Sequence, residues 1–516
     1  MSHPAAAHRI ATFGTTIFTE MSALAIQHQA INLGQGFPDF AGPDFVKQAA
    51  VAAINADLNQ YAPMPGLPSL RQAIAATWRS RTAHDIDPLA EVSIASGATE
   101  LLCDVMLSFI NPGDKVVVFE PAYDAYLPDI IMAGGTMLPV RLHPPDAQHS
   151  SWWYAEADLA QAFAQRPKLI LLNTPHNPTG KVFTHAELSH IAQLCQHHDT
   201  LAVVDEVYDR LVYDHHQHIH LASLPGMWER TISVNSIGKT FSVTGWKIGW
   251  AVAPAPLNQA LRATHQWVTF ATSTPMQQAS AVALTQAEHN GYYQQLAAEY
   301  ADRRHYLKDI LRQTNLPIID ADGSYFISVD VAPLGVTDVH TFCKRLAVEI
   351  GVVAIPMSAF YVTPDAPRLV RFCFAKKHAT MDAAAERLKR LHDISWAQAH
   401  SPNTAAPTTE AHAAVGAVVC GDPVLVETFR LADQCQQRLP DALQAHVHAI
   451  GSAVQILPDD NHVAPQLLNR VTQHAVGVAG RLLECIVERQ QHLFDPGHVV
   501  VLERQLRVTD VQQRPR

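Results

Sequence analysis

Residues 201–208 read LAVVDEVY, and residues 231–239 read TISVNSIGK. Each segment begins with a short apolar, β-branched run and ends in polar residues where a strand would stop. From Asn32 to about Leu391 such runs alternate with longer amphipathic segments, a pattern typical of a parallel sheet covered by helices. Open sheets of this kind bind ligands at the carboxyl ends of their strands, so we expect the polar residues to meet there.

The pattern predicts an α/β fold with a mostly parallel sheet, followed by a separate C-terminal segment. The expected strands, each ending in a polar or Gly/Pro-containing turn, are Lys115–Phe119, Lys168–Leu172, Leu201–Val204, Thr231–Val234 and Gly249–Val252. Residues 32–395 then form the catalytic region. Residues 396–415 are small, polar and proline-bearing, as in a linker, and residues 416–516 carry amphipathic runs that predict helices.

The composition argues against several classes of protein. Hydrophobic residues make up 48% and charged residues 16% of the 516 residues, as in a globular chain. A net charge of -11 leaves no basic surplus for a nucleic-acid backbone. The seven cysteines lack C-x-x-C spacing, and no apolar run approaches the roughly 20 residues of a membrane span. We expect a cytoplasmic enzyme for small molecules, with no nucleic-acid partner, membrane contact or metal site.

The most specific chemical signal lies just after the predicted strand 231–234. Lys239 ends the segment SIGK, Ser236 begins it, and Lys247 follows shortly after. A lone lysine in such a turn is usually a solvated cation. In this setting, however, Lys239 has the chemistry to condense with an aldehyde cofactor. Ser236 and Lys247 have the chemistry to bind its phosphate, by a hydrogen bond and a point charge.

The second signal is an acid at the end of the strand 201–204. A carboxylate at Asp205 would keep a pyridine ring nitrogen protonated, which an electron-sink cofactor needs. The alternative is that Asp205 only caps the following turn. Tyr208, in the same segment, has a hydroxyl that could donate to the phenolic oxygen of such a cofactor.

Three further turns supply candidate ligands. Asn177 lies in an Asn-Pro-Thr-Gly turn, which presents its amide rigidly but is also ordinary turn chemistry. Ala98 and Thr99 open an apolar helix, whose first N–H groups form a natural phosphate cradle. Tyr123 could stack on a cofactor ring, although a tyrosine in this setting more often packs in the core.

In this order, the motifs resemble the class I/II aminotransferases of fold type I over roughly residues 12–395. The segments NLGQGFPDF (32–40) and NQYAPM (59–64) are most similar to the methionine, glutamine and kynurenine aminotransferase group. The resemblance implies pyridoxal 5′-phosphate as cofactor and ping-pong transfer of an amino group from an L-amino acid to a 2-oxo acid. It also implies a large domain over about 45–280 and a small domain formed by the arm 1–31 and about 281–395.

The resemblance assigns roles at the cofactor. Lys239 is implied to be the Schiff-base lysine and proton carrier, with Asp205 on the ring nitrogen and Tyr208 and Asn177 on the phenolic oxygen. The implied phosphate ligands are Ala98, Thr99, Ser236 and Lys247. Most relatives have arginine where this chain has Lys247, which keeps the charge but loses a fork of donors.

The resemblance also assigns roles at the substrate. Arg371, in the segment LVRFCF (369–374), is implied to clamp the substrate carboxylate, with a backbone donor from Gly36 and with Asn177 nearby. Tyr61 is implied to reach the phosphate of a neighbouring subunit, which predicts a homodimer with shared active sites. Phe18 and Phe270 fall where this group surrounds its substrate with aromatic rings, which favours methionine, glutamine or aromatic amino acids; alternatively both pack in the core.

Two other functions are open at this stage. A C–S β-lyase of fold type I would use the same lysine and cofactor, and the motifs do not separate it from an aminotransferase. A cofactor-sensing transcription regulator would carry a DNA-binding module ahead of the catalytic region. Residues 1–31 offer little room for one.

Overall fold

The computed structural model describes residues 7–11 and 13–396. The predicted helical segment 416–516 lies outside the described residues, as does the predicted linker 396–415 apart from Trp396.

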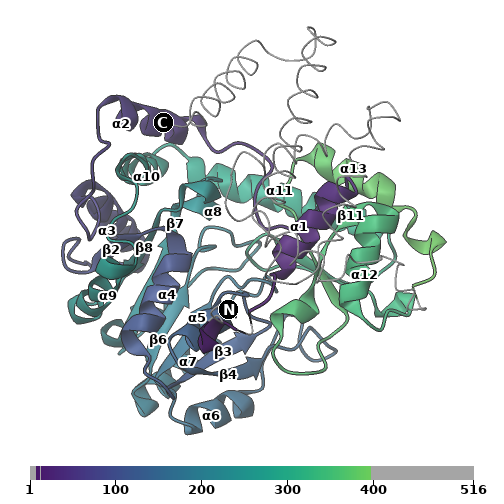
Figure 1. The fold of residues 1–516 in the computed structure, drawn as a ribbon, viewed down its shortest axis with the longest axis horizontal. Helices are drawn as coiled ribbons and strands as arrows, with labels where there is room; N and C mark the ends of the chain where they lie inside the picture. Colours follow the sequence, from purple (N-terminus) through teal and green to yellow (C-terminus); the bar gives the residue numbers. More distant parts are fainter. Residues whose placement is uncertain (1–6, 12, 397–516) are drawn as a thin grey trace, which may run out of the picture. The chain divides into compact units, whose positions relative to one another are not determined.

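A seven-stranded sheet carries the polar turns singled out above (Figure 1). Its order is β2 (Val92–Ala95), β8 (Gly249–Val252), β7 (Thr231–Ser236), β6 (Leu201–Asp205), β5 (Leu169–Asn173), β3 (Lys115–Glu120) and β4 (Thr136–Arg141). Neighbouring strands are parallel except where β8 pairs with β2 and β7. All five predicted strands are present, and the mostly parallel α/β class is confirmed. The reversed direction of β8 and the strands β2 and β4 were not predicted.

Helices cover both faces of this sheet. Along β5, Ile170 and Leu172 belong to one buried cluster, while Leu169 and Leu171 belong to another on the opposite face. Because side chains alternate along a strand, both faces must be covered, and the continuous apolar run reflects this. The helices in this part of the chain are α2 (Asp44–Asn55), α3 (Pro68–Thr82), α4 (Gly97–Phe109), α5 (Tyr126–Met132), α6 (Glu156–Ala164), α7 (His185–His198), α8 (Ile237–Thr240), α9 (Ala255–Val268) and α10 (Thr274–Ala287).

A smaller antiparallel sheet follows later in the chain. Its order is β12 (Ile355–Pro356), β13 (Leu369–Cys373), β10 (Phe326–Asp330) and β9 (Ile318–Ile319), and β1 (Ile31–Asn32) pairs separately with β11 (Val352–Val353). The helices here are α1 (Ile17–Gln27), α11 (Tyr292–Arg312), α12 (Val339–Arg345) and α13 (His378–Leu388). Figure 1 shows α1, in purple, beside the green helices, where Glu20 contacts Lys344 at 2.6 Å. The early arm therefore packs with the late segments.

The register of the large sheet decides where the candidate residues meet. Asn173 at the end of β5 pairs with Asp205 at the end of β6, and Asp205 pairs with Val234 on β7. On the other side of β7, Ser236 pairs with Gly249 of β8. The polar turns after these strands are therefore neighbours in space, as expected for the carboxyl edge of a parallel sheet.

Candidate active site

A pocket lies at this carboxyl edge. It is lined by every predicted cofactor residue except Tyr61: Ala98, Thr99, Tyr123, Asn177, Asp205, Tyr208, Ser236, Lys239 and Lys247. These residues come from turns that are up to about 150 positions apart in the sequence. The structure therefore brings the separate motifs into one site.

Lys239 lies on α8, directly after β7, and its amine contacts polar atoms of two distant segments. Its Nζ donates to the hydroxyl of Tyr325 at 3.1 Å and to the carbonyl oxygen of Gly36 at 3.4 Å. Burial lowers the pKa of the Lys239 ammonium to about 8, against the attraction of the Asp205 carboxylate. The amine is therefore partly neutral slightly above neutral pH, the form that attacks an aldehyde.

Asp205 is held from two sides. Its Oδ2 accepts a hydrogen bond from the hydroxyl of Tyr126 at 2.8 Å, and its Oδ1 accepts one from the N–H of Val207 at 3.2 Å. Burial raises the pKa of Asp205 to about 6, against the hydrogen bond from Tyr126. The contact with Val207 is the capping interaction considered above as the alternative, and the same carboxylate also lines the pocket.

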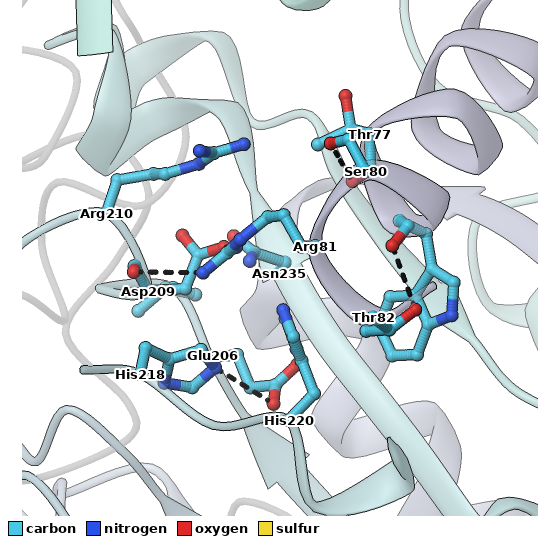
Figure 2. Close-up of polar contacts among 12 residues, drawn as sticks. Thr77, Ser80, Arg81, Thr82, Glu206, Asp209, Arg210, His218, His220 and Asn235 are labelled. Carbon is cyan, nitrogen blue, oxygen red and sulfur yellow. Dashed lines mark hydrogen bonds and ion pairs between the residues drawn. The ribbon is translucent and has the colours of Figure 1, made fainter. Parts of the chain in front are cut away.

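Glu206 points away from the pocket, although it adjoins Asp205 in the sequence. Its carboxylate accepts hydrogen bonds from His218 at 3.2 Å and His220 at 2.9 Å (Figure 2). Burial would raise the pKa of Glu206, but the two histidines hold it well below its usual range. One possible metal-ligand atom from each of Glu206, His218 and His220 lies within 4.8 Å of the others, an arrangement that could also hold a metal ion. Of this acidic pair, only Asp205 reaches the pocket.

The start of α4 has the features of a phosphate cradle. Gly97 has a φ of +83°, and a Cβ there would lie 3.4 Å from Nζ of Lys247, so the lysine amine lies close to the first turn. At Gly249, a Cβ would lie 2.4 Å from the carbonyl carbon of Gly97, so β8 approaches the helix only because it has glycine here. A helix N-terminus with a lysine and the hydroxyls of Thr99 and Ser236 matches the chemistry of a bound phosphate.

Asn173 connects the Asn177 turn to the end of β6. Its amide nitrogen donates to the carbonyl oxygen of Asp205 at 2.9 Å, and its Oδ1 accepts the N–H of Asn177 at 2.6 Å. This residue was not predicted from the sequence, although it opens the same Asn-Thr-Pro-His-Asn segment. The turn therefore has a fixed position relative to Asp205.

Arg371, on β13 of the small sheet, reaches the same region. Its Nη1 donates to Oδ1 of Asn177 at 2.7 Å, and its Nη2 donates to the carbonyl oxygen of Gly34 at 2.9 Å. Its Nε is buried and has no hydrogen-bond partner among the described residues. A buried guanidinium N–H without an acceptor lowers the stability of the folded state, and a carboxylate is the acceptor that best pairs with it.

Aromatic rings surround the Arg371 guanidinium. Its central carbon lies 3.9 Å from the ring centroid of Phe326, 5.2 Å from Phe360 and 5.3 Å from Phe18. Phe18 was predicted, whereas Phe326 and Phe360 were not, because neither lies in a recognisable motif. The groups around the arginine head are therefore mainly apolar, apart from the two oxygens that it contacts.

Tyr61 and Phe270 lie elsewhere. Their ring centroids are 5.7 Å apart, and the residues are 85% and 45% exposed, respectively. Trp267 and Val268, just before Phe270, are also exposed, at 83% and 49%. Neither Tyr61 nor Phe270 lines the Lys239 pocket of its own chain. We call Tyr61, Trp267, Val268 and Phe270 the 61/270 surface.

Comparison with known proteins decides the family. The family described as aminotransferase class I and II matches residues 28–388. The chain belongs to this family. The methionine aminotransferase of Escherichia coli K12 is 39% identical to the chain over 384 residues, covering 74% of this chain and 97% of the relative. Kynurenine–oxoglutarate transaminase 3 of the mouse is 40% identical over 403 residues, covering 74% and 89%.

A solved aminotransferase has the same fold. The structure of N-succinyldiaminopimelate aminotransferase from Mycobacterium tuberculosis matches with a TM-score of 0.72 at 41% identity, covering 75% of this chain and all of that one. The resemblance predicted from the motifs is therefore confirmed. The protein is an aminotransferase of fold type I that uses pyridoxal phosphate to move an amino group from an amino acid to a 2-oxo acid. Among the described residues, none of the helices has the length and hydropathy of a membrane span.

Proposed function

We propose that this aminotransferase attaches pyridoxal phosphate at Lys239 and acts on L-amino acids with uncharged side chains, such as methionine, glutamine or the aromatic amino acids. The observation that carries the proposal is the buried Nε of Arg371, which has no hydrogen-bond partner within residues 7–11 and 13–396 and belongs to the same site as the Lys239 amine. An amino acid brings the two groups that this site needs, an amine for the cofactor and a carboxylate for the arginine.

Each side of the pocket has groups suited to one part of the cofactor. The Asp205 carboxylate, fixed by Tyr126 and Val207, would hold the ring nitrogen protonated. Tyr208 and Asn177 would donate to the phenolic oxygen, and Tyr123 would stack on the ring. The phosphate would bind at the start of α4, where the donors are Ala98, Thr99, Ser236 and Lys247.

Pyridoxal phosphate supplies an aldehyde for the substrate amine and a ring that accepts electrons from the substrate Cα. The chain's own residues do the rest. Lys239 Nζ would take the proton from the substrate Cα, because burial has lowered the pKa of its ammonium to about 8. Arg371 would fix the carboxylate by a charged fork, with the guanidinium itself oriented by Asn177 and Gly34. A backbone donor from Gly36 would complete the carboxylate site.

The preference for uncharged side chains is supported by the rings around Arg371. Phe18, Phe326 and Phe360 surround the guanidinium within 5.3 Å. Apolar rings stabilise an apolar or aromatic side chain, and a second carboxylate would be desolvated there without a partner. Dicarboxylic amino acids should therefore be poor donors.

A homodimer is supported by the 61/270 surface. The large apolar residues of this surface are 45–85% exposed in one chain, and a cluster of this kind marks a site that another surface covers. The resemblance to the family implies that Tyr61 reaches the phosphate of the neighbouring subunit, and Phe270, whose ring centroid lies 5.7 Å from that of Tyr61, would reach the neighbouring pocket with it. We propose a dimer with shared active sites, located in the cytoplasm.

The proposed domain division follows the two sheets. The large domain spans about 45–280, and the small domain combines the arm 1–31 with about 281–395. The contacts of Glu20 on α1 with α12 support the inclusion of the arm. The linker 396–415 and the C-terminal segment 416–516 complete the proposed organisation.

Two measurements test the proposal. Borohydride reduction of the purified enzyme, followed by peptide mapping, should find the cofactor fixed to Lys239. A panel of amino donors with 2-oxoglutarate should rank methionine, glutamine and phenylalanine above aspartate, with a new amino acid formed in each case. A parallel assay with a cysteine S-conjugate, whose sulfur is on Cβ, separates the alternative: release of thiol, ammonia and pyruvate there, with no new amino acid formed from any donor of the panel, would favour the β-lyase instead. A cofactor fixed to another lysine would refute the assignment of the site.

A further inference from the structure

Tyr325 is the closest protein partner of the Lys239 amine, and no sequence motif pointed to it. The residue is fully buried and lies just before β10. Its hydroxyl oxygen accepts a hydrogen bond from Lys239 Nζ at 3.1 Å, and its hydroxyl proton is donated to the carbonyl oxygen of Gly36. Nζ also donates to that carbonyl, at 3.4 Å. The three groups therefore form a closed set of hydrogen bonds.

The backbone makes this contact possible at Gly36. A Cβ there would lie 2.8 Å from Cζ of Phe326 and 3.3 Å from Cε2 of Tyr325. Any other residue would require the loop or the Phe326 ring to shift, so glycine at position 36 allows the Gly36 carbonyl to approach the Tyr325 hydroxyl. Two residues earlier, the carbonyl of Gly34 accepts from Arg371 at 2.9 Å. One short loop thus contacts both Lys239 and Arg371.

The rings around Tyr325 hold its hydroxyl in one place. It stacks on Tyr300 with ring centroids 6.2 Å apart and meets Tyr208 edge-on at 4.9 Å. A buried tyrosine packed in this way has few alternative rotamers. Its hydroxyl can therefore act as a fixed point for a flexible lysine side chain, which otherwise has several rotatable bonds.

We propose that Tyr325 is a positioning residue for the reaction, whose hydroxyl fixes the Lys239 amine beside the Gly36 loop. This inference rests on the proposed role of Lys239. Because the hydroxyl proton is committed to Gly36, only its oxygen lone pair faces Nζ. The hydroxyl therefore accepts from the amine and leaves the amine's own lone pair free for the proton of the substrate. Orientation of this kind contributes to turnover more than to substrate affinity.

The test compares two full-length variants that each lose one hydroxyl from the same stack of rings. Tyr325→Phe removes the contact with Lys239 and keeps the ring. Tyr300→Phe is the matched control, because Tyr300 is buried beside Tyr325 and its hydroxyl makes no hydrogen bond to Lys239 in the described part of the chain. The first measurement is the pH dependence of Lys239 carbamylation by cyanate in the cofactor-free chain, followed by mass spectrometry of the peptide.

An acceptor favours the charged amine, so its loss should lower the labelling midpoint of Tyr325→Phe by at least about half a pH unit. In the holoenzyme, kcat should fall about tenfold while KM stays within about twofold. Tyr300→Phe should behave as wild type in both measurements. An unchanged midpoint in Tyr325→Phe overturns the proposal, even if turnover falls, and so does an equal shift in Tyr300→Phe. These outcomes are independent of the borohydride mapping, which tests the role of Lys239 itself.

Discussion

The residues of the Lys239 pocket and of the 61/270 surface differ in where the structure places them, although Tyr61 and Phe270 were predicted from the same family resemblance as the pocket residues. The pocket gathers residues from β5, β6, β7 and the start of α4 within one chain. The 61/270 surface puts Tyr61 and Phe270 together but leaves them exposed and away from Lys239. In the proposed dimer, one chain would hold the cofactor ring and the substrate carboxylate, and a second copy would complete the site.

Removal of the pocket's lysine should have the largest effect. Lys239→Ala loses both the attachment point and the base that moves the proton, so turnover should fall by at least about 10⁴-fold. The measurement is steady-state transamination, with borohydride reduction to show that the cofactor is no longer fixed to the chain. Transamination near the wild-type rate in this variant would show that the pocket is not the catalytic one.

Asp205→Asn should have the next largest effect. The neutral amide keeps nearly the same shape but no longer stabilises a protonated ring nitrogen, so kcat should fall at least about a hundredfold. Circular dichroism should show an intact fold, because the amide oxygen can still accept from one of its two present donors, Tyr126 and Val207. Glu206→Gln is the control, because Glu206 contacts His218 and His220 rather than the pocket. It should affect stability rather than kcat.

Arg371→Lys should chiefly raise KM for amino acids, by about tenfold or more, and lower kcat less. Lysine keeps the charge but loses the fork that contacts Asn177 and Gly34, as well as the unpaired Nε. The KM of the 2-oxo acid should rise with that of the amino acid, because both carry the same carboxylate. A change confined to kcat would contradict the assigned role.

The 61/270 surface can be tested by mixing two variants. Tyr61→Ala and Lys239→Ala should each be impaired as homodimers. If Tyr61 serves the neighbouring subunit, a mixed dimer has one site with an intact Lys239 and an intact Tyr61 from the other chain. Random mixing then restores up to about a quarter of the wild-type activity. Complementation that fails although mixed dimers form would mean that Tyr61 serves its own chain or no site at all, and the comparison above would not hold.

A site residue could be predicted from the sequence when a local motif and the register of one sheet fix its position, and not when packing against a distant segment does. Asp205, Asn177 and Lys239 each follow a strand of one parallel sheet, so a local motif together with the register brings them together. Tyr126 lines the same pocket from α5, and Tyr325, just before β10 of the other sheet, contacts Lys239. No local pattern marks either residue. The reversal of β8 escaped prediction because apolar periodicity is the same for both strand directions.

The smallest effect is expected from removal of all residues beyond Trp396. This variant also tests whether residues 397–516 are needed for the active site. Every residue of the pocket and of the 61/270 surface precedes this point. Trp396 itself closes the described core: its ring lies 4.7 Å from Phe342, and its Nε1 donates to the carbonyl oxygen of Leu391 at 2.7 Å.

A chain ending at Trp396 keeps these contacts, so it should fold, bind pyridoxal phosphate and transaminate within about twofold of the full chain. Gel filtration, the cofactor absorbance and kcat would measure this. The residues beyond 416 carry amphipathic runs with apolar faces that something must cover. If the shortened chain is insoluble or fails to retain the cofactor, those faces are needed by the aminotransferase itself, and the division into two units would have to be abandoned.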